Sequence, residues 1–108
     1  MTYRIRVTRH AELQIFDAEL WWLENREKAP LLFEEELAAA YNRIARAPSI
    51  VGMEVPNPHE KGVFRILMPK TKTHVYYTID EEARSFTVVA VWGAAKEHGP
   101  DLGPNTPV

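Results

Sequence analysis

The residues best suited to chemistry are basic and lie in the second half of the chain. Between residues 61 and 79 there are four bases and no acid: Lys61, Arg65, Lys70 and Lys72. His74 falls in the same stretch, and Lys96 and His98 follow near the C-terminus. Guanidinium and ammonium groups stabilise anions, and an imidazole can accept a proton near neutral pH. The stretch is therefore a candidate anion-binding surface, but it has few cations for an affinity that depends on phosphate contacts.

Several other chemistries lack the residues they need. The chain has no cysteine, which excludes disulfides, thiolate metal sites and thiol nucleophiles. Its four histidines form no His-x-x-x-His pair and no carboxylate-rich cluster, so no metal site is expected. Its two serines and five glycines form neither a nucleophile elbow nor a phosphate-binding loop. We therefore expect no cofactor.

Length and charge narrow the class of protein further. A chain of 108 residues is the size of one domain, which we place at residues 1–95, with an irregular Gly- and Pro-containing tail at residues 96–108. The net charge of −2 argues against generic nucleic-acid binding. The N-terminus lacks the apolar segment of a signal peptide, and no apolar run approaches the roughly 20 residues that span a bilayer. We expect a cytoplasmic protein with no membrane partner.

Periodicity predicts the elements that must position these side chains. Residues 3–8 alternate apolar and polar side chains, as a strand with one solvent-exposed face does. Thr8 is a suitable N-cap for a helix that follows it. Residues 9–26 and the segment ending before Pro48 show helical spacing, and the short break between them predicts an antiparallel helical hairpin. Residues 50–55, 63–68, 73–79 and 86–92 are β-rich and predict an antiparallel meander. The fold class is α+β, with the hairpin packed on one face of the sheet.

The first helix carries more apolar residues than one core-facing stripe can hold. The stripe predicted to face the core consists of Leu13, Phe16, Leu20 and Leu23. Because successive helical residues are turned by about 100°, Trp21 or Trp22 must then lie at a flank or outside. Leu31 and Leu32 add an apolar cluster at the tip of the hairpin. Either the protein's own sheet or tail covers this surface, or a partner does.

The element order and four short motifs resemble the RelE/ParE toxins of type II toxin–antitoxin modules. Phe64-Arg65-Ile66-Leu67 looks like the family's arginine-bearing strand, and residues 73–80, THVYYTID, look like its aromatic strand. Residues 88–92, VVAVW, look like the closing strand, and Gly99-Pro100-Asp101-Leu102 like the tail of the ParE-like branch. The resemblance covers residues 3–102 and implies a toxin, with a role such as plasmid stabilisation, that a cognate ParD-like antitoxin neutralises.

The family has two activities, and the residues favour one of them. RelE-like members cut mRNA in the ribosome with several basic side chains and a base near the C-terminus, whereas ParE-like members bind DNA gyrase without chemistry of their own. Here Arg65 matches the strand arginine, but residues 50–55 carry no lysine or arginine, and Gly93 stands where relatives often have histidine or tyrosine. The resemblance therefore implies a ParE-like gyrase inhibitor. The alternative is an mRNA endonuclease that uses Arg65, Lys96 and His98.

A partner-binding surface is predicted on both parts of the fold. The antitoxin is expected to lie across the hairpin and the sheet, and a substantial part of it should be disordered until bound. The residues expected to contact partners are Trp21, Trp22, Leu31, Leu32, Arg65, Lys70, Lys72 and His74. Each also has a plainer interpretation: solvated bases in a strand or turn, and tryptophans covered by the protein's own chain.

Overall fold

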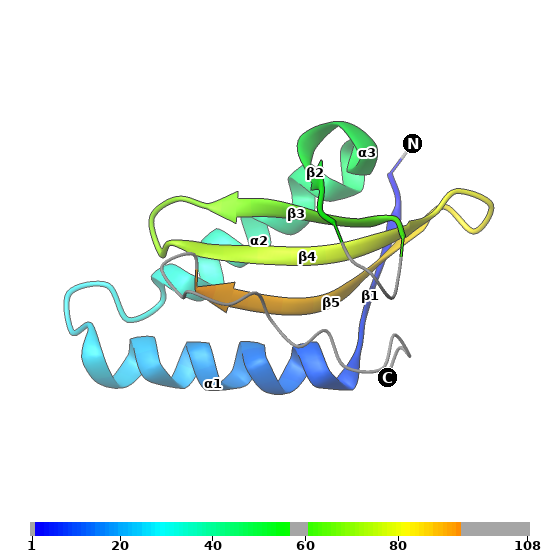
Figure 1. Cartoon of the computed structure of the whole chain (residues 1–108). Coiled ribbons are helices and arrows are strands. Elements are labelled where there is room, and N and C mark those ends of the chain that lie inside the picture. Colours follow the sequence, from blue (N-terminus) through cyan, green and yellow to red (C-terminus); the bar gives the residue numbers. More distant parts are fainter. Residues whose placement is uncertain (1, 57–60, 94–108) are drawn as a thin grey trace.

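The computed structural model describes residues 2–56 and 61–93, and these form one layered α+β unit (Figure 1). The helices are α1 (Arg9–Asn25), α2 (Leu32–Arg46) and α3 (Pro48–Val51). The strands are β1 (Arg4–Val7), β2 (Met53–Glu54), β3 (Val63–Met68), β4 (Thr73–Asp80) and β5 (Ser85–Gly93). The predicted boundary at residue 95, the tail, Lys96 and His98 lie outside the described residues. No described helix is long and apolar enough to cross a bilayer.

The five strands form one sheet in the order β1-β5-β4-β3-β2. The antiparallel meander of β3, β4 and β5 is confirmed, and β1 joins at the edge by pairing parallel to β5. The strand predicted at residues 50–55 is wrong in its first half, where α3 begins with Pro48 at its first turn. Proline suits a first helical turn because it lacks the N–H that would have no partner there. Only Met53 and Glu54 remain as strand, paired with β3.

The β1–α1 junction follows the sequence closely. Thr8 is buried, and its hydroxyl accepts a hydrogen bond from the N–H of Ala11 at 3.1 Å, so the predicted N-cap is confirmed. Pairing of β1 with β5 ends at Val7 and Val88, after which the chain turns into α1. The helix continues beside the edge of β5 that β1 leaves open. There the Gln14 side-chain oxygen accepts a hydrogen bond from the N–H of Val91 at 2.9 Å.

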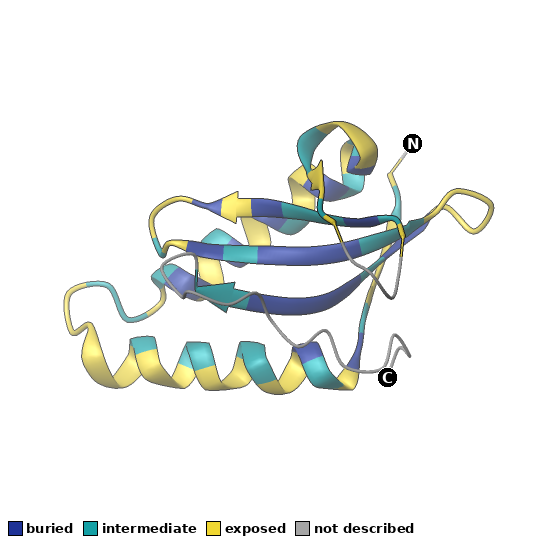
Figure 2. Cartoon of the chain, viewed as in Figure 1, coloured by how far each residue is buried: buried dark blue, intermediate teal, exposed yellow. Residues whose placement is uncertain are grey.

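The stripe predicted to face the core from α1 points outward instead. Leu13, Phe16, Leu20 and Leu23 are between 42 and 62% exposed. The side that packs against the core carries Ala11, Ile15, Ala18 and Trp22. Ala11 and Ala18 are small, which lets Gln14 approach the backbone of β5 within hydrogen-bond distance. Figure 2 shows the result, a helix with one partly buried side and one exposed side against a largely buried sheet.

The main core lies between α2 and the inner face of the sheet. The second segment with helical spacing is a helix, and the apolar residues that give it that spacing are buried: Phe33, Leu37, Ala40 and Ile44. It packs with inward residues of the central strands, among them Ile66, Val75 and Phe86. Tyr77 is fully buried in the same cluster, and its hydroxyl donates a hydrogen bond to the carbonyl oxygen of Pro48 at 2.6 Å. This bond ties the α2–α3 junction to the middle of the sheet.

Candidate functional site

The sheet face opposite α2 carries the side chains best suited to bind an anion or accept a proton. Alternation along β3 and β4 places Arg65, His74 and Tyr76 on this face, while Phe64 and Tyr77 point into the core. Arg65 and Tyr76 are direct cross-strand partners, and His74 stands opposite Trp92. Paired residues on one face have their Cβ atoms about 5 Å apart, so the four side chains are neighbours. Arg65, His74, Tyr76 and Trp92 are called the sheet-face cluster below.

The electrostatics of the cluster suit a neutral imidazole beside a cation. The rings of His74 and Tyr76 meet edge to face with centroids 6.1 Å apart. Burial lowers the pKa of His74, and the positive charge of Arg65 lowers it further. At neutral pH the imidazole is therefore available to accept a proton, next to a guanidinium that can hold an anion. The cluster has the components for anion binding and for proton transfer.

Cations are nevertheless sparse and scattered on this face. Among the described residues of β2 to β5, Arg65 is the only lysine or arginine. Arg4 and Arg6 of β1 share the face, since they pair with Ser85 and Thr87 of β5. They stand three strands away from β3, about 14 Å at the usual strand spacing. Arg4 and Arg6 were not among the predicted contact residues, although the alternation of residues 3–8 puts them on one side of the strand.

Lys70 and Lys72 lie at one end of the sheet, in the predicted turn between β3 and β4. Both side chains are exposed. The turn is fastened to α2 by Glu36, whose carboxylate accepts hydrogen bonds from the N–H of Lys70 and from the N–H and hydroxyl of Thr71 at 2.7–2.9 Å. Burial acts to raise the pKa of Glu36, but these hydrogen bonds outweigh it and the pKa is lowered. A cavity of about 260 Å³ lies beside this contact, between α2 and the end of β3.

Trp21 and Trp22 belong to the other side of the molecule. Trp22 packs against the core from α1, whereas Trp21 is 46% exposed. The guanidinium of Arg26 lies over both rings, at 5.1 and 5.6 Å from their centroids. Leu31 is half exposed at the start of α2, and Leu32 lines the cavity described above.

The predicted contact residues therefore do not form one patch. The structure brings Arg65 and His74 together on the helix-free face, and adds Tyr76 and Trp92 to them. Lys70 and Lys72 project from the turn at the sheet end, while Trp21 and Leu31 lie with the helices (Figure 1). No group of three or more potential metal ligands occurs in residues 2–56 and 61–93. Whether these residues contact partners remains a prediction.

Comparison with solved structures identifies the architecture. A chain of the RelBE2 toxin–antitoxin complex from Mycobacterium tuberculosis superposes with a TM-score of 0.64 at 18% identity, covering 86% of this chain and 99% of that one. The chain has the RelE fold. A free, doubly substituted RelE toxin from E. coli superposes with a TM-score of 0.56 at 13% identity, covering 88% of this chain and 86% of its own. No protein-family model matches the sequence, and the curated proteins contain no significant match. The α+β class and the RelE-like arrangement of elements expected from the sequence are thereby confirmed.

Proposed function

We propose that this protein is the toxin of a type II toxin–antitoxin system and acts as a ParE-like inhibitor of DNA gyrase. The observation that carries the toxin assignment is the RelE fold, which accounts for nearly nine-tenths of the chain. One of the matched chains comes from a toxin–antitoxin complex. By analogy a cognate antitoxin is the expected partner of this chain.

The preference for inhibition over RNA cleavage follows from the distribution of cations. Cleavage requires positive charge where the phosphate becomes more negative, together with a proton acceptor. Arg65 is the only lysine or arginine in β2 to β5 within the described residues, and Arg4 and Arg6 are about 14 Å away across the sheet. One guanidinium is a weak basis for phosphoryl chemistry. Binding to a protein target needs no such arrangement.

The second candidate is a ribosome-dependent mRNA endonuclease, and the sheet-face cluster is the observation in its favour. Arg65 would hold the scissile phosphate, and His74, whose pKa is lowered, would accept the proton of the attacking hydroxyl. The partly exposed Trp92 offers a ring on which an unpaired base could stack, whereas Tyr76 is buried beneath this face. Lys96 and His98, outside the described residues, remain the further contributors expected from the sequence.

Two assays on the purified protein separate these activities. For the gyrase inhibitor we expect loss of supercoiling at stoichiometric protein and no new cuts in translated mRNA by primer extension. Arg65→Ala should leave gyrase inhibition largely unchanged, with Arg46→Ala, an exposed arginine at the end of α2, as the matched control. Transcript cuts that disappear in Arg65→Ala but not in Arg46→Ala, with supercoiling unaffected, would establish the endonuclease instead. Inactivity in both assays together with tight antitoxin binding would indicate a relative that only binds its partner.

The antitoxin itself has expected properties. It should be disordered in part until bound, with acidic residues that pair with Arg65 and with the Lys70 and Lys72 turn. An open reading frame beside this gene, encoding a small protein with a DNA-binding N-terminal half, is the simplest observation in support. Co-expression of that protein should restore growth and raise the solubility of this chain.

A further inference from the structure

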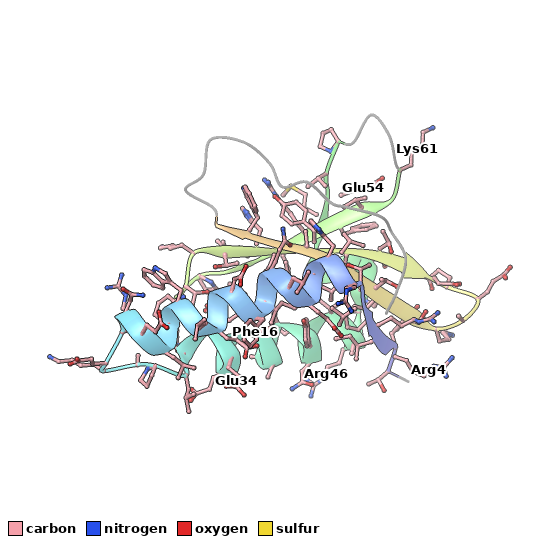
Figure 3. All side chains as sticks on the ribbon, turned by 90° about the horizontal axis from the view of Figure 1, so that it is seen from below. Arg4, Phe16, Glu34, Arg46, Glu54 and Lys61 are labelled. Atoms are coloured by element: carbon pink, nitrogen blue, oxygen red, sulfur yellow. The ribbon has the colours of Figure 1, made fainter. Side chains whose placement is uncertain are left out.

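The outward side of α1 is an apolar stripe with helix-pairing geometry. Its four members are large, exposed and separated by three, four and three residues: Leu13, Phe16, Leu20 and Leu23. This is the alternation by which one α-helix packs its a and d positions against a second helix. We call this surface the α1 stripe; it extends over about 15 Å of helix. Figure 3 views the molecule from this side and shows α1 and α2 next to each other, with Phe16 on α1 and Glu34 on α2.

Acids flank the α1 stripe on both sides. Glu12 and Glu19 immediately precede Leu13 and Leu20, and Asp17 and Glu24 immediately follow Phe16 and Leu23. In a heptad these are the g and e positions, whose charges select the partner helix. The Glu12 and Glu19 flank faces α2, since Glu34 of α2 acts with burial to raise the pKa of Glu19. From Glu12 to Glu24 the helix carries no base. Arg9 lies one turn before Leu13 at the start of α1, and Arg26, one residue past the helix, is engaged over the two tryptophan rings.

These charges decide among the possible occupants. A second copy of α1, whether parallel or antiparallel, would set acids opposite acids at every flanking position and be repelled. An anionic membrane surface would be repelled for the same reason. A helix with lysine or arginine at its flanking positions would instead form complementary pairs on both sides of the apolar contact.

We propose that the α1 stripe is the docking site for an amphipathic helix of a partner protein, whose apolar face is flanked by lysine and arginine. The partner's apolar residues pack between Leu13, Phe16, Leu20 and Leu23, and its bases pair with the acids on either side. This inference goes beyond the proposed toxin activity and does not depend on it, because it rests on the surface of α1 alone.

A designed helix tests the proposal directly. The probe is a fluorescein-labelled peptide of about three heptads with leucine at a and d and lysine at e and g, and the control peptide has glutamate in place of the lysines. We expect anisotropy and a rise in helicity to report binding of the lysine peptide and none of the glutamate peptide. Phe16→Ala with Leu20→Ala should weaken binding at least about tenfold, as removal of central apolar contacts does at protein interfaces. Circular dichroism should show the variant folded, because Phe16 is 62% and Leu20 42% exposed and neither belongs to the buried core.

Charge reversal supplies the matched control. Asp17→Lys with Glu24→Lys should weaken binding of the lysine peptide and allow the glutamate peptide to bind. Glu35→Lys with Glu82→Lys replaces exposed acids outside the stripe and changes the net charge equally, so it should leave the preference for the lysine peptide unchanged. Lysine-peptide binding that both double variants of the stripe leave unchanged would overturn the proposal. So would wild-type dimerisation at neutral pH that Phe16→Ala with Leu20→Ala abolishes, or equal binding of both peptides. Binding to phosphatidylglycerol vesicles through the stripe would also refute it. None of these readouts uses toxicity, so failure of the toxin assignment would remain distinguishable.

Discussion

Gly52 meets Tyr77 so closely that a single methyl group should destabilise the fold. A Cβ placed on Gly52 would lie 2.1 Å from the Tyr77 hydroxyl oxygen and 2.9 Å from the ring carbon that bears it. The Gly52 backbone, with φ −102° and ψ 167°, is open to any residue, so the obstacle is steric. Tyr77 cannot easily move, because it is fully buried and its hydroxyl is held by Pro48. Burial raises the pKa of Tyr77 to about 12, which keeps that hydroxyl a donor at neutral pH.

The magnitude follows from these contacts. Gly52→Ala should lower the free energy of unfolding by roughly 2 kcal/mol. Overpacking destabilises the folded state by up to about 3 kcal/mol, and the lower conformational entropy of the unfolded chain with alanine offsets about 0.7 kcal/mol of that. Tyr77→Phe should cost about 1.5 kcal/mol, since the Pro48 carbonyl loses its buried donor. In the double variant the hydroxyl that clashes with the added methyl group is absent. Its cost should be about 2 kcal/mol rather than the additive value of roughly 3.5 kcal/mol, a coupling of about 1.5 kcal/mol.

Urea unfolding of the wild type, both single variants and the double variant measures this coupling. Circular dichroism is the suitable signal, and equal m-values would show that the variants unfold over the same surface. Gly52→Ala alone should lower Tm by roughly 10 °C in a domain of this size. The proposed steric clash would be refuted if the free energy of unfolding of a single variant lay within about 0.5 kcal/mol of the wild-type value. It would also be refuted if the losses of the two single variants added up to that of the double variant. The test bears on the sheet-face cluster too, since a Cβ on Gly52 would also lie 3.1 Å from the carbonyl oxygen of Arg65.

Three smaller perturbations probe the contacts that position the helices. Glu36→Gln should lower the free energy of unfolding by about 1 kcal/mol at neutral pH. Because the pKa of Glu36 is lowered in the folded state, the wild-type carboxylate contributes its full stabilisation above the unfolded pKa of about 4.3. As the pH falls through the folded pKa, the difference in stability between the variant and the wild type should disappear. Gln14→Leu should speed hydrogen exchange of the Val91 amide and cost about 1 kcal/mol, because that N–H loses its acceptor. Thr8→Ala should lower the free energy of unfolding by about 1 kcal/mol, with Thr8→Ser retaining the cap.

Periodicity predicted most elements but not the orientation of α1. The buried stripe of α2 and the faces of β3 and β4 follow from the spacing that each segment carries in itself. For α1 the most apolar stripe was taken as the inner one. Tertiary geometry overrode that choice: the helix lies against an open strand edge, where Gln14 binds a backbone amide and small residues allow close approach. A local pattern does not reveal such an edge.

Contacts between residues far apart in the sequence could not be predicted from local patterns either. Nothing within residues 3–8 indicates that β1 pairs parallel to β5, yet this pairing puts Arg4 and Arg6 on the same face as the sheet-face cluster. The contact of Tyr77 with Pro48 and Gly52 joins residues separated by 25 positions or more, and no turn or repeat marks it. Pro48 was taken only as the end of one helix, although it can equally begin the next.

The two candidate binding surfaces make opposite electrostatic demands on whatever covers them. The α1 stripe is apolar with acidic flanks, whereas Arg65, Lys70 and Lys72 carry positive charge along the sheet and its end. A uniformly charged segment would be attracted to one surface and repelled by the other. A single neutralising polypeptide that binds both must therefore keep its charges apart, with bases on a helical segment and acids on the segment that reaches the sheet. Exchanging the charges of these two segments should abolish binding even though the net charge is unchanged.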